Sequence, residues 1–268
     1  MKRMNLSGRW LILTGASSGL GREMAVVLAR DHKTNLVLVA RREDRLQKLA
    51  TMLRERHGTE AEVLPADLSV TAEAERVFRT ATEAHPLYGA VLNAGVTHFG
   101  RYDELPWDGF MNMLNLNVTS QVRLTTLLLP YLEQRGEHGG LLIVSSMTGL
   151  APFAYQTAYS ATKSFLLAFG CGLCLEMEPR GVSVTTYAPG GIATEMVAGK
   201  RFDSLRSWLM PADECAVEGI DAFVKRRYLK IPGQLNRIGA VLMRLLPQKF
   251  VADTYAAQYK RALDRDAG

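Results

Sequence analysis

Cysteines are scarce in this sequence, and long uninterrupted runs of apolar residues are missing. Three cysteines in 268 residues are too few for a disulfide framework, which favours a reducing compartment and predicts a cytoplasmic protein. Every apolar run is shorter than the roughly eighteen residues of a membrane-spanning helix, and the run after the basic N-terminus is too brief for a secretory signal. We therefore expect a protein that is neither secreted nor inserted in a bilayer.

Linkers, internal repeats and low-complexity tracts are also missing. The apolar share of 47% and the charged share of 22% are those of an ordinary globular protein with a sizeable core. A net charge of +5 is too small to indicate nucleic acid as a partner. We expect residues 1–268 to form a single domain that acts on small molecules.

Short apolar segments alternate with segments of helical periodicity along the chain. The predicted strands cover residues 10–13, 36–40, 62–65, 90–92, 141–144 and 182–187, and the predicted helices cover 21–30, 43–56, 73–83, 107–134 and 160–177. Strands that are apolar on both faces are typical of a parallel sheet covered by helices on both sides. The sequence therefore predicts a Rossmann-type doubly wound α/β fold with about seven strands.

A glycine-rich segment, residues 14–21, lies between the first predicted strand and the first predicted helix. Glycines permit a tight turn and close approach of a pyrophosphate, and the helix N-terminus offers unpaired N–H groups. The spacing G-x-x-x-G-x-G differs from the standard G-x-G-x-x-G. The position of the segment still predicts a dinucleotide site, and an ordinary glycine turn is the alternative.

The second predicted strand ends in Arg41 and Arg42, without an acidic residue. An acid at this place binds the ribose hydroxyls of NAD(H), whereas an arginine can pair with the 2′-phosphate of NADP(H). The pattern favours NADP(H) over NAD(H); the alternative is two solvated loop arginines. Asp67 follows the third predicted strand and is expected to accept a hydrogen bond from the adenine amino group, or else to cap the next helix.

The chain resembles the short-chain dehydrogenase/reductase family in its single-domain form, over roughly residues 7–233. The matching motifs, in the family's order, are residues 14–21, Asp67, Asn93-Ala94-Gly95, Asn117, Ser146, Tyr159-x-x-x-Lys163 and Pro189-Gly190 with Thr194. With the strand-end residues above, the resemblance implies a cofactor site made of Gly15, Ser17, Ser18, Gly19, Leu20, Gly21, Arg41, Arg42, Asp67, Leu68, Asn93, Ala94, Gly95, Tyr159, Lys163, Pro189, Gly190, Ile192 and Thr194.

The resemblance also implies a catalytic group of Asn117, Ser146, Tyr159 and Lys163. A phenol has a pKa near 10, so Tyr159 needs the ammonium of Lys163, one helical turn away, to serve as the proton donor. Ser146 would donate to the substrate oxygen. Asn117 is expected to hold a water or a backbone carbonyl that links Lys163 to solvent. The alternative for Tyr159 and Lys163 is an ordinary helix with a solvated lysine.

Three stretches are expected to line the substrate pocket: residues 96–102, 147–155 and a lid over 195–210. The residues assigned to this pocket are Val96, His98, Met147, Phe153, Tyr155, Met196 and Phe202. A lining of this kind predicts an apolar substrate, such as a hydrophobic ketone or a 3-oxoacyl group. The alternative is that these side chains only pack on the core.

The C-terminal tail, residues 234–268, lies outside the strongest resemblance. Its apolar residues at helical spacing are Leu235, Ile238, Val241, Leu242, Leu245 and Leu246. We expect a helix that packs on the core or faces a second subunit; a basic amphipathic helix on an anionic membrane surface is the alternative. Two of the long predicted helices resemble those that pair subunits in the family, which predicts a homodimer or homotetramer.

The sequence thus predicts an NADPH-dependent oxidoreductase that reduces a carbonyl or oxidises the matching secondary alcohol. The rival hypothesis is a cofactor-sensing binding protein of the same fold without turnover, which should lack Tyr159 or Lys163. No metal site is expected, because Cys171 and Cys174 fall inside a predicted helix and no second ligand pair accompanies them.

Overall fold

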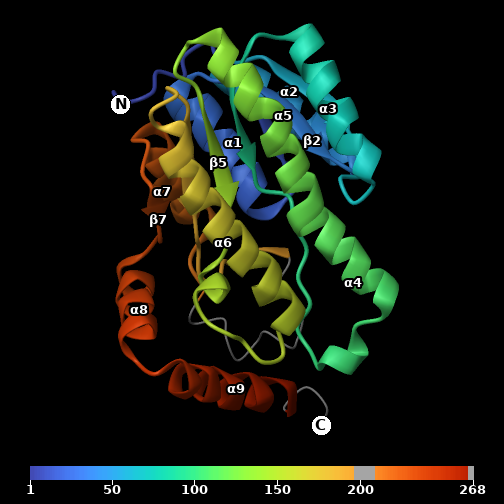
Figure 1. The fold of residues 1–268 in the computed structure, drawn as a ribbon. Helices are drawn as coiled ribbons and strands as arrows, with labels where there is room; N and C mark the ends of the chain where they lie inside the picture. Colours follow the sequence, from blue (N-terminus) through green and yellow to red (C-terminus); the bar gives the residue numbers. More distant parts are fainter. Residues whose placement is uncertain (196–208, 265–268) are drawn as a thin grey trace.

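The computed structural model describes residues 1–195 and 209–264, and its centre is a parallel sheet (Figure 1). The sheet has seven strands in the order β3-β2-β1-β4-β5-β6-β7. The strands are β1 (Trp10–Thr14), β2 (Asn35–Ala40), β3 (Ala61–Pro65), β4 (Leu87–Leu92), β5 (Gly140–Val144), β6 (Ser183–Tyr187) and β7 (Leu229–Lys230). Five of the first six are fully or almost fully buried along their length, as expected of strands covered on both faces.

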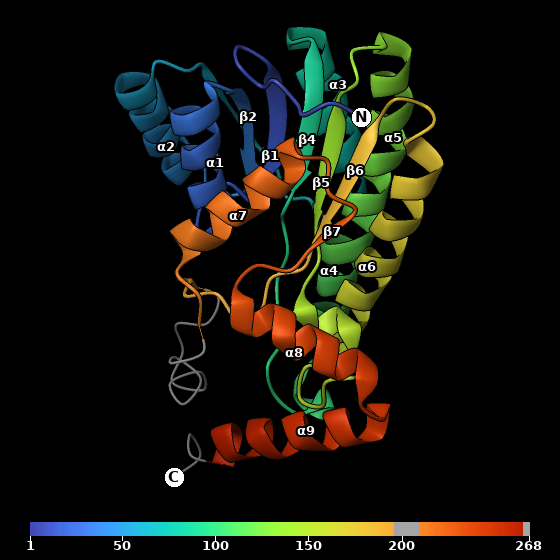
Figure 2. The same cartoon turned by 90° about the vertical axis from the view of Figure 1, so that its left-hand side faces the viewer.

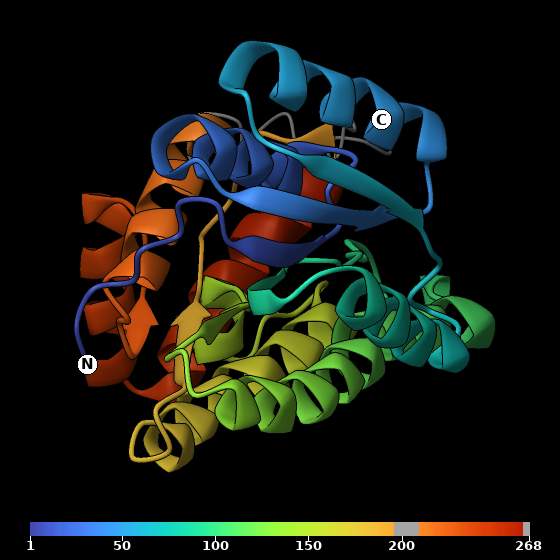
Figure 3. The same ribbon diagram turned by 90° about the horizontal axis from the view of Figure 1, so that it is seen from above.

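Helices cover both faces of the sheet (Figures 2 and 3). One face carries α1 (Gly19–His32), α2 (Glu43–His57) and α7 (Ala212–Val224). The other carries α3 (Thr71–Ala84), α5 (Ser120–Arg135) and α6 (Thr157–Met177), with α4 (Trp107–Leu114) preceding α5. Two separate apolar clusters fill the space between the sheet and these layers. The predicted doubly wound α/β fold is confirmed.

The strand order reverses between β1 and β4. The chain first builds the sheet from β1 toward β3 and then returns to add β4 on the other side of β1. At such a switch point the loops after the two central strands part and leave a crevice at the carboxyl ends of the strands. The fold therefore provides a binding crevice at the ends of β1 and β4.

The predicted helix over residues 107–134 is interrupted. A π-helical turn, Asn115–Thr119, separates α4 from α5. A π-turn widens a helix by one residue and is frequent at functional sites. Here it contains Asn117, whose side chain is completely buried.

The C-terminal tail forms two helices, α8 (Gln234–Leu245) and α9 (Gln248–Asp264), at the carboxyl end of the sheet (Figures 1 and 2). The inward face of α8 is narrow and includes Ala240 and Met243. The predicted apolar stripe is exposed instead: Leu235 by 80%, Ile238 by 58% and Leu245 by 76%. The expectation that this stripe packs on the core of the same chain is wrong, because the side of α8 that faces the core carries Ala240 and Met243 instead.

Within the described part of the chain, α6 is long and apolar enough, by length and composition alone, to cross a membrane. In this fold it packs against β6 and against a short helical turn, η3 (Met147–Leu150). It also carries Lys163, which is 3% exposed. These contacts make α6 part of the layer that covers the sheet.

Thr14, at the end of β1, joins that strand to the end of β4. Its hydroxyl oxygen accepts hydrogen bonds from the backbone N–H groups of Asn93, at 2.9 Å, and Ala94, at 3.0 Å. Thr14 is 1% exposed, so water cannot replace these bonds. The side chain therefore fixes the two strand ends that form the crevice.

We expect Thr14→Val to lower the free energy of unfolding by about 2 kcal/mol or more, because it leaves two buried N–H groups without an acceptor. Thr185→Val is the matched control. Thr185 is fully buried on β6, and its hydroxyl has no hydrogen-bond partner among the residues that the structure describes. Urea denaturation of both variants tests the assignment; equal losses would contradict the role of the Thr14 hydroxyl.

Candidate active site

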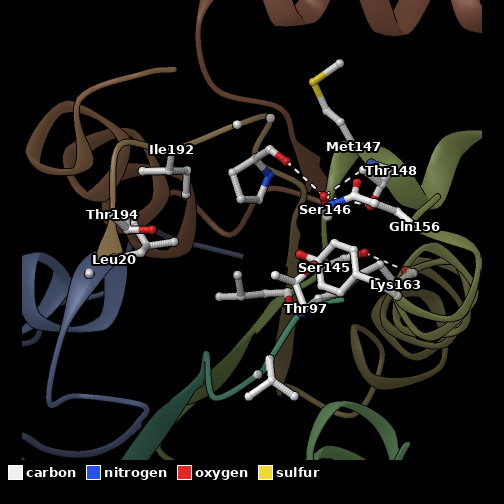
Figure 4. A pocket seen from close by; sticks show the side chains of 18 of the residues that line it. Leu20, Thr97, Ser145, Ser146, Met147, Thr148, Gln156, Lys163, Ile192 and Thr194 are labelled. Carbon is white, nitrogen blue, oxygen red and sulfur yellow. Dashed lines mark hydrogen bonds between the residues drawn. The ribbon is translucent and has the colours of Figure 1, made fainter. Parts of the chain in front are cut away.

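A cavity of about 990 Å³ lies at the carboxyl ends of the central strands. Figure 4 shows Leu20, Ile192 and Thr194 on one side of this cavity and Ser146, Gln156 and Lys163 on the other. Residues from α8 and α9 complete its wall. Most of the predicted glycine turn and three of the predicted catalytic residues, Ser146, Tyr159 and Lys163, thus border a single cavity.

The glycine turn fits a dinucleotide phosphate. Gly15 has a φ of +70°, and a Cβ on it would lie 2.7 Å from the side-chain nitrogen of Asn93. A Cβ on Gly21 would lie 2.3 Å from the carbonyl oxygen of Gly15. Ser18 is the residue before α1, and its side chain makes no capping hydrogen bond to this helix. The first N–H groups of α1 are therefore available to an anion.

The two predicted strand-end arginines point to different partners. Arg41 lies 3.8 Å from a carboxylate oxygen of Asp67. Arg42 donates to the hydroxyls of Ser17, at 2.9 Å, and Ser18, at 2.6 Å. Arg42 therefore places its positive charge directly beside the glycine turn.

Glu195 links Arg42 to a third arginine, Arg45, beside the glycine turn. Its carboxylate accepts from Arg42 at 3.2 Å and from Arg45 at 2.8 Å, and the two arginines lower its pKa, with the Arg45 hydrogen bond as the larger cause. Arg45 escaped the motif search, although its spacing of three residues from Arg42 on α2 could have revealed it.

Asp67 borders the cavity but is already engaged within its own turn. Its Oδ1 accepts from the backbone N–H of Ser69 at 3.0 Å and from the Ser69 hydroxyl at 2.7 Å. Burial acts to raise the pKa of Asp67, but the bonds from Ser69 and the charge of Arg41 outweigh it and hold the pKa below its usual value. Val70, and not Asp67, is the N-cap residue of α3.

Ser146, Tyr159 and Lys163 come together on one wall of the cavity. Tyr159 and Ser146 both border the cavity, and Ser146 acts to lower the pKa of Tyr159. The Lys163 ammonium lies 5.7 Å from the centre of the Tyr159 ring and donates to the carbonyl oxygen of Val144 at 3.0 Å. This is the arrangement that proton transfer to a substrate oxygen requires.

Burial favours the neutral form of both titratable groups. It raises the pKa of Tyr159 to about 12, with the Ser146 hydrogen bond acting in the opposite direction. Burial also lowers the pKa of Lys163 to about 8. Tyr159 therefore keeps its proton at neutral pH, while the charge of Lys163 is sensitive to pH in the physiological range.

Asn117 holds a backbone carbonyl, one of the two roles expected of it. Its side chain donates to the carbonyl oxygen of Val96 at 2.9 Å and to the Thr162 hydroxyl at 3.1 Å, and it accepts from the N–H of Val96 at 2.8 Å. It does not border the cavity among the described lining residues. Asn117 thus fixes the segment after β4, and its expected link from Lys163 to solvent stays a prediction.

Apart from Gly21, which is buried behind the turn, the predicted cofactor residues all border the cavity. They are Gly15, Ser17, Ser18, Gly19, Leu20, Arg41, Arg42, Asp67, Leu68, Asn93, Ala94, Gly95, Tyr159, Lys163, Pro189, Gly190, Ile192 and Thr194. These residues come from loops after β1, β2, β3, β4 and β6, from the start of α1 and from α6, so the fold collects motifs that are distant in the sequence.

The predicted substrate residues divide into three groups. Val96, Met147 and Phe153 border the cavity. Met196 and Phe202 lie outside the described residues, as does most of the expected lid.

The third group, His98 and Tyr155, is absent from the described lining. The ring of His98 bonds the carbonyl oxygen of Arg101 at 3.1 Å, and the carbonyl oxygen of Tyr155 accepts from Gly100 N–H at 2.9 Å. Their assignment to the pocket is corrected: local hydrogen bonds hold this pair of residues in the loops beside it.

Helix α9 contributes a wall that motif searching missed. Tyr255 and Tyr259 border the cavity, and their rings lie 4.6 Å and 6.0 Å from the ring of Phe153, centre to centre. Burial raises the pKa of both tyrosines. Their spacing of four residues, which places them on one helical face, is the sequence signal that could have found them.

Comparisons with known proteins agree with this geometry. A family model described as short chain dehydrogenase matches residues 9–204. The 7beta-hydroxysteroid dehydrogenase of Collinsella aerofaciens is 29% identical over 236 residues, which cover 86% of this chain and 88% of that protein. Hydroxysteroid dehydrogenase-like protein 1 of Gallus gallus is 29% identical over 209 residues, 77% of this chain but only 62% of that longer protein.

The fold is also similar to solved structures. One is a short-chain dehydrogenase from Sphingobium yanoikuyae in complex with NADPH, with a TM-score of 0.79 and 31% sequence identity. The similarity covers 90% of this chain and 97% of the other.

Proposed function

Because this chain belongs to the short-chain dehydrogenase family, we propose that it is an NADP(H)-dependent oxidoreductase that reduces the carbonyl of an apolar substrate or oxidises the matching secondary alcohol. The observation that carries the proposal is the position of Tyr159, Ser146 and Lys163 in the wall of the cavity, with the Lys163 ammonium 5.7 Å from the centre of the Tyr159 ring. The substrate class is a hydrophobic ketone, of which a 3-oxoacyl group is one form.

Two observations support an apolar substrate. Phe153, Tyr255 and Tyr259 form an aromatic wall beside the catalytic residues, and such a wall favours ligands with large apolar surfaces. The similar protein from Collinsella aerofaciens is named as a dehydrogenase of a hydroxysteroid, which is a ligand of this kind. We therefore favour a bulky, ring-containing ketone over a sugar.

The mechanism follows from the catalytic wall. When bound, the reduced cofactor supplies a hydride to the carbonyl carbon. The Tyr159 hydroxyl transfers its proton to the carbonyl oxygen, so the carbonyl becomes a secondary alcohol and Tyr159 is left as a phenolate. The Lys163 ammonium stabilises this phenolate, and the Ser146 hydroxyl donates to the substrate oxygen as negative charge develops there. Oxidation of the alcohol follows the same path in reverse.

The preference for NADP(H) rests on charge near the glycine turn. Arg42 lies beside Ser17 and Ser18, and Arg45 lies one turn further along α2. Together they offer a bidentate site for a 2′-phosphate. Glu195 forms ion pairs with both arginines, so we propose that the phosphate displaces its carboxylate. NAD(H), which has no such phosphate, gains nothing from the exchange.

The wider proposal is a cytoplasmic homodimer or homotetramer whose protomer is one domain. Exposed apolar residues on α6, Phe165 at 45% and Leu175 at 63%, support pairing through this helix. The three cysteines are free, which fits a reducing compartment. The rival function is a cofactor-sensing protein without turnover. Tyr159 and Lys163 are both present and both border the cavity, which favours the enzyme.

We expect Tyr159→Phe to bind NADPH as the wild type does and to lose about a hundredfold or more in turnover, because no other group replaces the proton donor. Tyr155→Phe, on the neighbouring loop, is the matched control and should keep its activity. The measurement is NADPH oxidation with a panel of apolar ketones. A wild type that binds NADPH but reduces none of them would favour the cofactor-sensing protein.

The pKa of Lys163 predicts the pH dependence of reduction. Above its pKa of about 8, Lys163 loses its charge and stabilises the phenolate less, so kcat/KM for reduction should fall as pH rises through about 8. Tyr159, with a pKa near 12, does not titrate in this range. Lys163→Arg keeps its charge and should move the fall to higher pH. A fall at the same pH in both proteins would assign it to another group.

Substitutions around Glu195 should have opposite effects on cofactor affinity. We expect Arg42→Gln to raise the Kd for NADPH about tenfold while changing the Kd for NADH little. Glu195→Gln should lower the Kd for NADPH, because its carboxylate no longer competes for the two arginines. Arg22→Gln, an exposed arginine paired with Glu23, is the control. Fluorescence titration measures all three; parallel changes for NADPH and NADH would refute the phosphate site.

A further inference from the structure

One surface of the C-terminal tail is apolar and exposed. The side chains that form it, called the α8 face below, are Leu235, Ile238, Val241, Leu242, Leu245, Leu246 and Phe250. Those on α8 recur at the three- and four-residue spacing that places side chains on one side of a helix, and Leu246 and Phe250 follow at the end of α8 and the start of α9. Each is at least 40% exposed. A contiguous apolar surface of this kind marks a binding surface on a protein.

The charges around the α8 face have one sign. Residues 234–252 contain Arg237, Arg244 and Lys249 and no acidic residue. Lys249 pairs with Asp253, at 2.8 Å, whereas neither arginine forms an ion pair with a carboxylate in the described part of the chain. On the neighbouring α7, Glu218 is already paired with Lys230 at 2.7 Å. The apolar surface therefore has a positively charged border.

The α8 face continues into the active-site cavity. Leu242, Leu246 and Phe250 are exposed on this face, by 48%, 40% and 59%, and they also border the cavity. Further in, Met243 of the same helix is buried and borders the cavity as well. The mouth of the cavity thus opens at the α8 face.

We propose that the α8 face docks on an anionic lipid membrane, with its leucines among the acyl chains and its arginines at the lipid phosphates. Exposed apolar residues on one side of a helix and cations at their border are the two features that hold a helix in the interface. Docked in this way, the cavity opens toward the bilayer, and an apolar ketone dissolved in lipid reaches Tyr159 without crossing water. This access route rests on the proposed function; the docking does not.

The charge pattern argues against a second copy of this chain as the occupant. A symmetric contact places the same surface of both copies together. Arg237 and Arg244 of both copies would then border one interface, and residues 234–252 offer no carboxylate to neutralise them. Like charges brought together in this way oppose association. Anionic lipid supplies the missing negative charge.

Sedimentation with vesicles of phosphatidylcholine, alone or mixed with phosphatidylglycerol, tests the docking without substrate or turnover. We expect the wild type to bind the mixed vesicles more strongly than the neutral ones, and to bind less at high salt. Leu235→Ser with Leu245→Ser should weaken binding about tenfold or more, because two apolar side chains are lost from the interface. Neither residue borders the cavity in the described lining, so the cofactor affinity should not change.

Two control proteins separate the parts of the surface. Leu235→Met with Leu245→Met keeps the apolar character and should bind vesicles as the wild type does. Arg237→Gln with Arg244→Gln should remove the preference for phosphatidylglycerol. A wild type that stays in solution with both kinds of vesicle would overturn the proposal. A double-serine variant that binds vesicles as strongly as the wild type would also overturn the proposal. So would a wild type that is a dimer without vesicles and a double-serine variant that is a monomer, because the α8 face would then be a contact between subunits.

Discussion

The candidate active site depends on a buried ammonium group held by a backbone carbonyl. Lys163 is 3% exposed, and no carboxylate among the described residues forms an ion pair with it. Burying an unpaired charge is costly, and the hydrogen bond to the carbonyl oxygen of Val144 offsets only part of that cost. The lowered pKa of Lys163 is the visible sign of the remainder. The same bond joins α6 to the end of β5, and this contact sets the position of Tyr159 against Ser146.

The sheet explains why this bond can form. Val144 ends β5 and Ser146 follows it, so both lie at the carboxyl edge of the sheet together with the ends of β1 and β4. Thr14 joins β1 to β4 by side-chain bonds, and Asn117 joins the loop after β4 to α6 through Thr162. A continuous set of polar contacts therefore runs across the crevice, beneath the surface that contacts the ligand.

The sequence was sufficient where the determinants are local. Strand and helix periodicity, the glycine turn and the spacing of Tyr159 from Lys163 each depend on neighbouring residues, and the structure places these features as expected. The π-turn at Asn117 could not be predicted, because it inserts a single residue into a helix whose apolar pattern runs through it. The positions of His98 and Tyr155 also escaped prediction: the ring of His98 bonds the carbonyl oxygen of Arg101 in its own loop, and a backbone bond joins Tyr155 to Gly100 in a loop distant in the sequence.

The tail shows a similar limit. Its apolar spacing specified a helix, but not which side of the helix faces the protein; the path of the chain into α9 decides that. The arginines at the end of β2 had identical sequence support, yet only Arg42 turns toward the glycine turn, because the serine hydroxyls lie on its side. Direction in space, and not residue type, was the missing information in both cases.

The aromatic wall of α9 has a consequence for how this protein can diverge. Tyr255 and Tyr259 lie beyond residue 204, where the match to the family ends, whereas Ser146, Tyr159 and Lys163 lie inside it. The proposed substrate-facing wall and the proposed proton-transfer residues thus lie in separate stretches of the chain. Substitutions in α9 can therefore change the apolar wall of the cavity without altering Ser146, Tyr159 or Lys163.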